Sequence, residues 1–296
     1  MNIAVIGAGQ MGNGIAHVMA QSEHDVVLID VSEENLQKAI GTIAKNLDRQ
    51  LAKGTITTEL RDRTLKQITT STDLPAAVAN AGLVIEAATE NIDLKLRIFR
   101  DLEQHAPAGA ILASNTSSIS ITMIAAATRR ADRVIGMHFM NPVPVMKLVE
   151  VIRGYNTSDA TAETIVDLSK AIGKVPVLVN DHAGFVANRI LMPMINEAIE
   201  TLFQRVGGVA EIDTIMKLGM AHPMGPLQLA DLIGLDTCLA ILRVLHEGFG
   251  NPKYAPCPLL VQMVAAGKLG MKSGEGFYVY SAGSKDLVVS PAFRAS

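Results

Sequence analysis

NIAVIGAGQMGNGIA, residues 2–16, is the stretch of sequence that most constrains the fold. Its opening apolar run, residues 2–6, predicts a buried strand, and residues 11–21 have the apolar spacing of a helix. The string GAGQMG, residues 7–12, joins the two. A G-x-G-x-x-G string that follows a strand and opens a helix is typical of a dinucleotide-binding site.

Each residue of this string has an expected role. Gly7 permits the tight turn, Gly9 lets a pyrophosphate approach the backbone, and Gly12 allows close packing of helix against strand. Gln10 and Met11 begin the helix, whose N–H groups and partial positive charge attract phosphate. We therefore assign these residues to cofactor binding. The alternative is a glycine-rich turn without a ligand.

An acidic residue, Asp30, follows at the end of the next predicted strand, eighteen residues after Gly12. A carboxylate at this position accepts hydrogen bonds from the adenosine ribose and repels a 2′-phosphate. Val31 and Ser32 come next, so no adjacent arginine receives such a phosphate. The pattern therefore predicts NAD as the cofactor, in preference to NADP.

Strand-like and helix-like segments alternate through the first part of the chain. After the strand-like residues 25–30, an amphipathic helix is predicted from about Glu33 to Lys53. Further short apolar runs follow at residues 82–87, 110–113, 133–137, 145–152 and 174–179. The alternation predicts an α/β fold whose doubly wound, mostly parallel sheet is covered by helices on both faces.

The pattern becomes helical beyond about residue 181. Helical stretches are predicted at 184–206, 210–218, 226–248 (with a break at Gly234) and 258–267, with one short strand-like run at 276–280. We expect a dinucleotide-binding domain over residues 1–182, an all-α domain over 183–281 and a tail with little to bury over 282–296.

Composition narrows the range of partners. The 296-residue chain has a formal net charge of −3, which favours neither nucleic acid nor an anionic membrane surface. No apolar run is long enough for a membrane span, and no charged-then-apolar leader precedes the first strand. Cys238 and Cys257 have no metal-ligand spacing, so we expect no metal. A cytoplasmic protein with a small-molecule partner is predicted.

A hydroxyl, an imidazole and a carboxylate lie in SNTSSISITMI (residues 114–124) and GMHFMNPVPVMKLVEVI (residues 136–152). These are Ser117, His138 and Glu150. A serine hydrolase has such a trio, but Ser117 lacks the sharp G-x-S-x-G turn, and acyl transfer does not explain the dinucleotide motif. An imidazole beside a nicotinamide is suited to removing the hydroxyl proton of a secondary alcohol, while an ionised glutamate orients its ring.

Five ordered motifs resemble the 3-hydroxyacyl-CoA dehydrogenase family, with the best likeness to its short-chain bacterial members that act on 3-hydroxybutyryl-CoA. They are GAGQMGNGIA, SNTSSISI, GMHFMNPVPVMKLVEV, DHAGFVANRI and HPMGPLQLADLIGLD, and the likeness spans roughly residues 1–281. The resemblance implies an N-terminal Rossmann domain, a helical C-terminal domain that binds substrate and forms a homodimer, and a place in fatty-acid metabolism.

The same resemblance implies a role for individual residues. His138 corresponds to the catalytic base, Glu150 to its partner, Ser117 to a hydroxyl that contacts substrate and cofactor, and Asn188 to the amide that binds the substrate's 3-oxygen. Further positions are expected near the nicotinamide half of NAD: Glu90, Lys95, Asn115, Asn141 and Lys272. Lys53 is the candidate for contacting the CoA phosphates.

The expected reaction is reversible oxidation of an (S)-3-hydroxyacyl-CoA to the 3-ketoacyl-CoA. A same-fold dehydrogenase of a free hydroxy or sugar acid, similar to L-gulonate dehydrogenase, is the alternative enzyme. A 6-phosphogluconate-type enzyme fits less well, because it relies on a catalytic lysine. A non-catalytic NAD-binding protein similar to a crystallin is the alternative outside catalysis.

Overall fold

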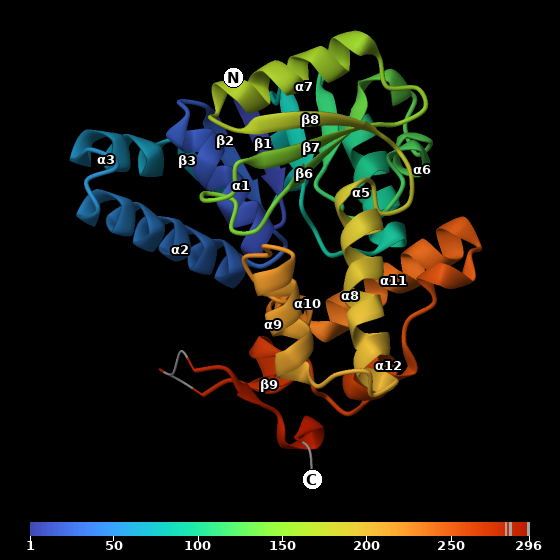
Figure 1. Ribbon diagram of the computed structural model, residues 1–296. Coiled ribbons are helices and arrows are strands. Elements are labelled where there is room, and N and C mark those ends of the chain that lie inside the picture. Colours follow the sequence, from blue (N-terminus) through green and yellow to red (C-terminus); the bar gives the residue numbers. More distant parts are fainter. Residues whose placement is uncertain (282, 284–285, 295–296) are drawn as a thin grey trace. The chain divides into compact units, whose positions relative to one another are not determined.

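The computed structural model describes residues 1–281, 283 and 286–294. The chain divides into two compact units, Met1–His182 and Ala183–Ser296 (Figure 1). Each unit has its own cluster of buried apolar side chains. Within the described residues, no helix combines the length and apolar character needed to cross a membrane.

An eight-stranded sheet forms the first unit, with the order β3-β2-β1-β4-β5-β6-β7-β8. The strands from β3 to β6 are parallel, β7 is antiparallel to β6, and β8 is parallel to β7. Their bounds are β1 Asn2–Ile6, β2 Asp25–Ile29, β3 Ile68–Ser71, β4 Leu83–Glu86, β5 Ile111–Ser114, β6 Val134–Phe139, β7 Leu148–Arg153 and β8 Val175–Asn180. The doubly wound, mostly parallel sheet predicted from the sequence is confirmed.

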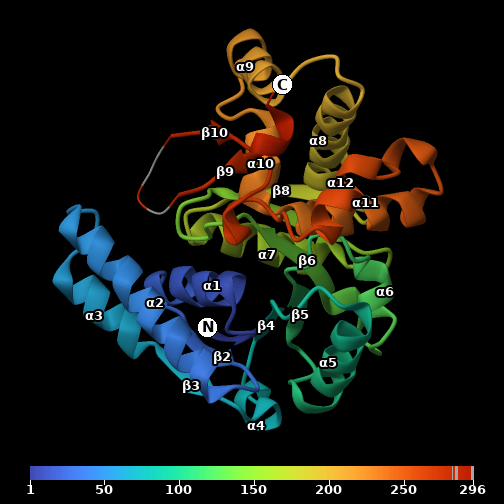
Figure 2. The same ribbon diagram turned by 90° about the horizontal axis from the view of Figure 1, so that it is seen from below.

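The helices of this unit connect successive strands and cover the sheet. They are α1 Gln10–Gln21, α2 Glu33–Ala52, α3 Thr58–Lys66, α4 Leu74–Val78, α5 Ile92–His105, α6 Ile121–Ala125, the 3-10 turn η1 Ala131–Arg133, and α7 Asp159–Ala171. Figures 1 and 2 show α2 and α3 as a helical pair beside the β3 edge of the sheet. The sequence patterns did not predict β3 and α3, because Ile68 is the only buried residue of β3 and Thr64 the only one of α3.

Helix α1 differs from the other α-helices of this unit in its N-cap residue. Every α-helix from α2 to α7 begins after a residue whose side chain accepts a hydrogen bond from a first-turn N–H: Ser32, Thr57, Asp73, Asn91, Ser120 and Ser158. The N-cap of α1 is Gly9, which has no side chain to do so. The first-turn N–H groups of α1 are therefore left for an external acceptor such as a phosphate.

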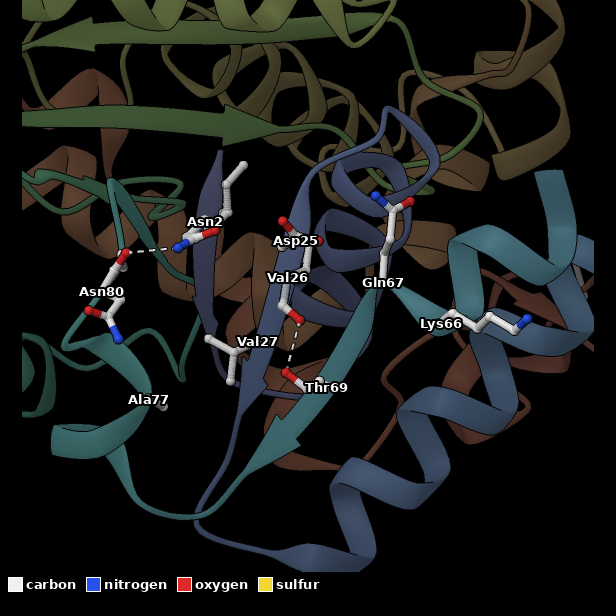
Figure 3. A pocket seen from close by; sticks show the side chains of 11 residues that line it. Asn2, Asp25, Val26, Val27, Lys66, Gln67, Thr69, Ala77 and Asn80 are labelled. Atoms are coloured by element: carbon white, nitrogen blue, oxygen red, sulfur yellow. Dashed lines mark hydrogen bonds between the residues drawn. The ribbon is translucent and has the colours of Figure 1, made fainter.

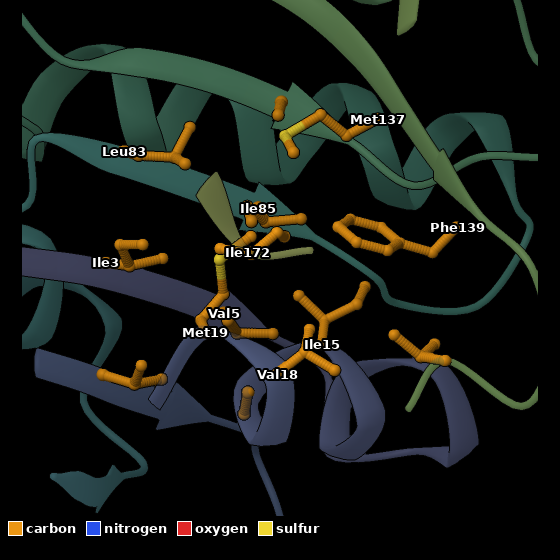
Figure 4. Close-up of a cluster of buried hydrophobic side chains, with 14 of the residues drawn as sticks. Ile3, Val5, Ile15, Val18, Met19, Leu83, Ile85, Met137, Phe139 and Ile172 are labelled. Atoms are coloured by element: carbon orange, nitrogen blue, oxygen red, sulfur yellow. The ribbon is translucent and has the colours of Figure 1, made fainter. Parts of the chain in front are cut away.

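Apolar side chains from the sheet and from α1 pack together as the core of the first unit. Ile3 and Val5 of β1 lie against Ile15 and Met19 of α1, and Phe139 at the end of β6 belongs to the same cluster (Figure 4). Each is at most 1% exposed, and full burial of one such side chain stabilises a fold by about 1.5–3 kcal/mol. The core thereby holds the end of β6 close to the helix that follows the glycine-rich turn.

A buried histidine on α1 makes the stability of this unit sensitive to acid. His17 is fully buried, and burial lowers its pKa from 6.5 to about 4, with the Lys174 charge acting in the same direction. The stability that neutral His17 contributes is complete above the unfolded pKa of 6.5 and is lost as the pH falls towards 4.

When the pH is lowered from 7 to 5, protonation of this histidine on unfolding should reduce the free energy of unfolding by about 2 kcal/mol. We expect His17→Gln to remove about that amount of the pH dependence, measured from urea midpoints at several pH values. The same substitution at the exposed His105 serves as the control. Equal slopes in the wild type and the His17 variant would contradict the prediction.

The second unit is mainly helical. It contains α8 Ala187–Phe203, α9 Val209–Gly219, α10 Pro226–Ile233, α11 Leu235–Phe249 and α12 Pro258–Ala265, with the 3-10 turns η2 Pro252–Tyr254, η3 Met271–Ser273 and η4 Pro291–Phe293. A small antiparallel pair joins β9 Tyr278–Val279 to β10 Val288–Val289. The predicted break at Gly234 is confirmed, because this residue has φ of +101° between α10 and α11.

The described part of residues 282–296 differs from the tail expected from the sequence. Val288 and Val289 of β10 pair with β9, and Ser290 is 1% exposed. The ring of Phe293 lies 5.7 Å from that of Phe277, between centroids. This segment is polar or small at most positions, so its pairing with β9 was not visible as an apolar pattern.

Two buried aspartates tie β9 to the helices of the second unit. Asp213 of α9 accepts hydrogen bonds from Leu227 N and from the Tyr278 hydroxyl. Asp231 of α10 accepts from the backbone N–H groups of Phe277 and Tyr278. Burial raises the pKa of Asp231 to about 6, although these hydrogen bonds favour its ionised form. The carboxylates thus add polar links to the apolar packing of Phe277 and Tyr278 against the helices.

Candidate active site

The glycine-rich turn opens onto a pocket of about 670 Å³ at the carboxyl ends of β1, β2 and β4. Gly7 has φ of +97°, which favours glycine, and a Cβ added at Gly12 would lie 1.7 Å from the Gly7 carbonyl oxygen. A Cβ added at Gly9 meets nothing within 4 Å, so open space lies directly beside the backbone there. The turn therefore fits the pyrophosphate of a dinucleotide, which needs such an approach.

Asp30 lines the same pocket and is held by the chain itself. Its Oδ2 accepts from Ala8 N at 2.8 Å, and its Oδ1 accepts from Ser32 N at 3.0 Å and Asn35 Nδ2 at 3.3 Å. These contacts fix the carboxylate over the glycine-rich turn and leave further lone pairs for ribose hydroxyls. A carboxylate fixed at this position would repel the 2′-phosphate of NADP.

Arg97 also lines this pocket, from the helix α5. The sequence around Asp30 did not reveal it, because it lies 67 residues later. We expect kcat/KM of the wild type to be higher with NAD than with NADP. In Asp30→Ala, the ratio of kcat/KM with NAD to kcat/KM with NADP should fall by about tenfold or more, because the carboxylate that repels the 2′-phosphate is removed while the cationic Arg97 remains. Steady-state kinetics with both cofactors measure this, and a wild-type preference for NADP would contradict the role of Asp30.

His138 and Glu150 form a buried pair on neighbouring strands. They lie directly opposite each other in the antiparallel register of β6 and β7. His138 Nδ1 is 2.7 Å from Glu150 Oε2, and the two residues are 8% and 3% exposed. Because Nδ1 faces a carboxylate, we assign the proton to this nitrogen, which makes Nε2 the basic nitrogen of the ring.

Glu90 links the Ser117 turn to helix α5. Its Oε1 accepts from Thr116 Oγ1 at 2.6 Å, Ser117 N at 2.9 Å and Ser117 Oγ at 3.2 Å. Burial alone would raise the pKa of Glu90, but the Lys95 charge and the hydrogen bonds from Thr116 and Ser117 together lower it. An ionised Glu90 therefore holds the Ser117 hydroxyl and the loop that carries it.

The buried part of this network contains Glu86, which was not predicted from the sequence, and Lys95, which was predicted to lie near the nicotinamide. Glu86, at the end of β4, is fully buried and accepts from Lys95 Nζ at 2.8 Å and from Ser114 Oγ at 2.6 Å. Lys95 is 1% exposed and lies 3.3 Å from Glu90 Oε2 as well. The sequence contained one indication of Glu86, because an acid ends the apolar run LVIE and a buried carboxylate requires polar partners.

The two asparagines predicted near the nicotinamide lie at the same edge of the sheet. Asn115 follows β5, and its Oδ1 accepts from Phe139 N at 2.9 Å, which ties it to the residue after His138. Asn141 is exposed in the connection between β6 and β7. The first unit therefore brings together Asp30, Glu90, Lys95, Asn115, Ser117, His138, Asn141 and Glu150 at the carboxyl edge of strands β1 to β6.

Other predicted residues lie elsewhere. Asn188 is 8% exposed on α8, and Lys272 of η3 forms an ion pair with Asp236; both belong to the second unit, and their roles stay predictions. Lys53 is an exposed residue at the end of α2, and its contact with CoA likewise stays a prediction.

A second pocket, of about 250 Å³, opens at the amino ends of β1 and β2, the opposite edge of the sheet. Asn2, Asp25, Lys66 and Asn80 are among its lining residues, and Asn2 Nδ2 donates to Asn80 O (Figure 3). It contains no predicted site residue. Among the described residues, no group of three or more His, Cys, Asp or Glu side chains is placed to hold a metal ion.

The chain matches known family models over nearly its whole length. Residues 2–182 match the NAD-binding domain of 3-hydroxyacyl-CoA dehydrogenase, and residues 184–280 match the C-terminal domain of the same family. The chain therefore belongs to the 3-hydroxyacyl-CoA dehydrogenase family, and the cofactor of its first domain is NAD.

Individual relatives agree with this assignment. The chain is 55% identical to a probable 3-hydroxybutyryl-CoA dehydrogenase of Deinococcus radiodurans, with 95% of this chain and 100% of the relative covered. It is 54% identical to a 3-hydroxybutyryl-CoA dehydrogenase of Bradyrhizobium diazoefficiens, with 94% of each covered. The crystal structure of (S)-3-hydroxybutyryl-CoA dehydrogenase PaaH1 from Ralstonia eutropha is similar at a TM-score of 0.91 and 51% identity, covering 95% of this chain and 99% of that one.

Proposed function

We propose that this NAD-dependent 3-hydroxyacyl-CoA dehydrogenase interconverts (S)-3-hydroxybutyryl-CoA and acetoacetyl-CoA, with His138 as its general base and acid. The observation that carries the proposal is the buried His138–Glu150 pair, with 2.7 Å between Nδ1 and Oε2. It presents a basic nitrogen at the same edge of the sheet as the dinucleotide pocket. The relatives with more than half of their residues identical are named for this substrate.

The reaction divides between the protein and its cofactor. NAD, when bound, accepts the hydride that leaves the hydroxyl-bearing carbon. His138 Nε2 takes the proton of the same hydroxyl group, so the C–H and O–H bonds break while the C=O double bond forms. The imidazolium that results is stabilised by the Glu150 carboxylate. In reduction, His138 returns the proton to the oxygen.

Ser117 and Asn188 are assigned to the substrate oxygen. The Asn188 amide can donate to the negative charge that develops there, and the Ser117 hydroxyl can do so once its proton turns from Glu90 Oε1 to the bound substrate. One well-placed donor contributes about 3–4 kcal/mol. Glu90, through its contacts with Ser117 N and Oγ, fixes the loop from which this hydroxyl acts. Protein donors of this kind are effective because they need no reorganisation during the reaction.

The substrate can be identified with a series of 3-ketoacyl-CoAs of increasing chain length. We expect acetoacetyl-CoA to give the highest kcat/KM in NADH oxidation, with a decline as the acyl chain grows. A maximum at a long or ω-carboxylated chain would contradict the short-chain assignment.

For Lys53, we expect Lys53→Ala to raise KM for acetoacetyl-CoA and to leave KM for NADH unchanged.

We also propose that the protein is a homodimer formed through its second unit. Several large apolar side chains of that unit are exposed, and single proteins rarely leave such a set uncovered. They include Ile190 at 67%, Ile215 at 61%, Leu218 at 82% and Met220 at 60%. Light scattering should give twice the chain mass.

The dimer is tested with a pair of surface variants. Leu218→Glu should shift the mass towards that of one chain, because it places a charge in the apolar interface. Tyr155→Glu, at an equally exposed residue of the first unit (89%), should leave the dimer intact. A monomeric wild type, or equal effects of the two variants, would contradict the proposal.

The buried free thiols Cys238 and Cys257 fit the reducing cytoplasm that we propose as the location.

A further inference from the structure

The connection between β6 and β7, residues 140–147, links the strand of His138 to the strand of Glu150. It folds into a compact turn, in which Pro142 O accepts from Val145 N and Met146 N, both at 2.9 Å. Asn141 lies in the same connection, immediately before Pro142. The position of this connection therefore bears on both members of the acid–base pair and on a predicted cofactor contact.

Lys174 completes this turn from another part of the sequence. Its Nζ donates to Val143 O at 2.5 Å and to Met146 O at 2.8 Å. Lys174 immediately precedes β8, which begins at the edge of the sheet where β6 ends, because Leu148 pairs with Val175 and β7 is antiparallel to β6. A lysine at the start of an outer strand thus reaches the functional edge.

The environment of this ammonium group is unusual. Lys174 is 8% exposed, and no acidic side chain forms an ion pair with it among the described residues. Burial lowers its pKa, which shows that the site disfavours the charge. A buried cation is costly unless it is well bonded, so the two carbonyls of the connection are the contacts that retain it.

The connection also packs against α1. Val143 is 2% exposed, and a Cβ added at Gly14 would lie 2.8 Å from the Val143 Cβ. Gly14 follows the glycine-rich turn on the same helix. The connection is therefore held by two sets of contacts, one from α1 and one from Lys174.

We propose that Lys174 is a positioning residue, which holds the β6–β7 connection so that Asn141 is placed for the nicotinamide half of the cofactor and His138 for the substrate. The inference rests on the proposed role of Asn141. It predicts that loss of the Lys174 donors weakens contacts to the nicotinamide half and spares those to the ADP-ribose half, which lie at the glycine-rich turn and Asp30.

Lys174→Met tests this proposal by calorimetric titration with NADH and with ADP-ribose, which lacks the nicotinamide. We expect the Kd of NADH to rise about tenfold and that of ADP-ribose to change less than about twofold, while kcat with acetoacetyl-CoA falls about tenfold. Lys174→Arg, which keeps a cationic donor, should restore much of the NADH affinity. Lys170→Met removes an exposed lysine of α7 and should change neither constant.

Val143→Ala provides a second route, because it loosens the α1 side while both carbonyls stay bonded to Lys174. Val143→Ala should show the same selective loss of NADH affinity. It therefore tests the proposal independently if Lys174→Met does not fold. Parallel loss of NADH and ADP-ribose binding in these variants, or unchanged NADH binding, would overturn the proposal. The two binding titrations do not depend on turnover. Failure of this proposal can therefore be distinguished from failure of the proposed reaction.

Discussion

Replacing His138 by glutamine should lower kcat by about 10²–10⁴-fold, the contribution of a well-placed general acid–base group. Glutamine keeps most of the volume and a hydrogen-bonding side chain opposite Glu150, but it has no basic nitrogen. NADH should bind to His138→Gln about as tightly as to the wild type, because the glycine-rich turn and Asp30, which line the dinucleotide pocket, are unchanged. Steady-state turnover in both directions and a fluorescence titration with NADH measure the two effects.

Two comparisons make this prediction specific. Glu150→Gln should lower kcat as well, since a neutral amide no longer favours the imidazolium, although the base itself remains. His105→Gln, at an exposed position on α5, should leave turnover unchanged. Retained turnover in His138→Gln would disprove the assignment of the base and leave the fold assignment intact.

Gly12→Ala should have a similarly large effect through a different cause. The new Cβ would lie 1.7 Å from the Gly7 carbonyl oxygen, a backbone atom that cannot move aside without displacing the turn. We expect a loss of about 3 kcal/mol in unfolding free energy and a rise of about hundredfold in the Kd of NADH. Denaturant unfolding and NADH titration of the purified variant check both values.

Other glycines provide matched controls for Gly12. A Cβ at Gly9 meets nothing within 4 Å in the protein, so Gly9→Ala should retain stability and lose NADH affinity, because the methyl group occupies the approach of the pyrophosphate. Gly41, in the middle of α2, also has open space, and alanine there should stabilise the helix by about 0.5–1 kcal/mol. Full NADH binding by Gly12→Ala would contradict the proposed packing of turn and helix.

The sequence patterns predicted the sheet and its main helices because the spacing of apolar residues and the positions of glycines agree locally. Strands with four or more buried residues, such as β1 and β6, are the clearest cases. β3 was missed because one buried residue produces no period. β10 was missed because the strand has only two residues, in an apolar run of three, and is stabilised by pairing with β9.

The candidate site was predictable where chemistry is concentrated in motifs. His138 and Glu150 are twelve residues apart in sequence, and the connection that contains Asn141 brings them into register. Glu86, Arg97 and Lys174 were not predicted, because each reaches its neighbours through the sheet or a helix face. Such residues stand alone in sequence, so only the three-dimensional arrangement reveals their partners.

The most direct test of the account compares acetoacetyl-CoA with free acetoacetate as the oxidant of NADH in the wild-type protein. A dehydrogenase of 3-hydroxyacyl-CoA should consume NADH with acetoacetyl-CoA and show a kcat/KM several orders of magnitude lower for the free acid, because the CoA portion contributes binding energy used in the transition state. Equal or better use of free acetoacetate, or no NADH consumption with any acyl-CoA, would contradict the account.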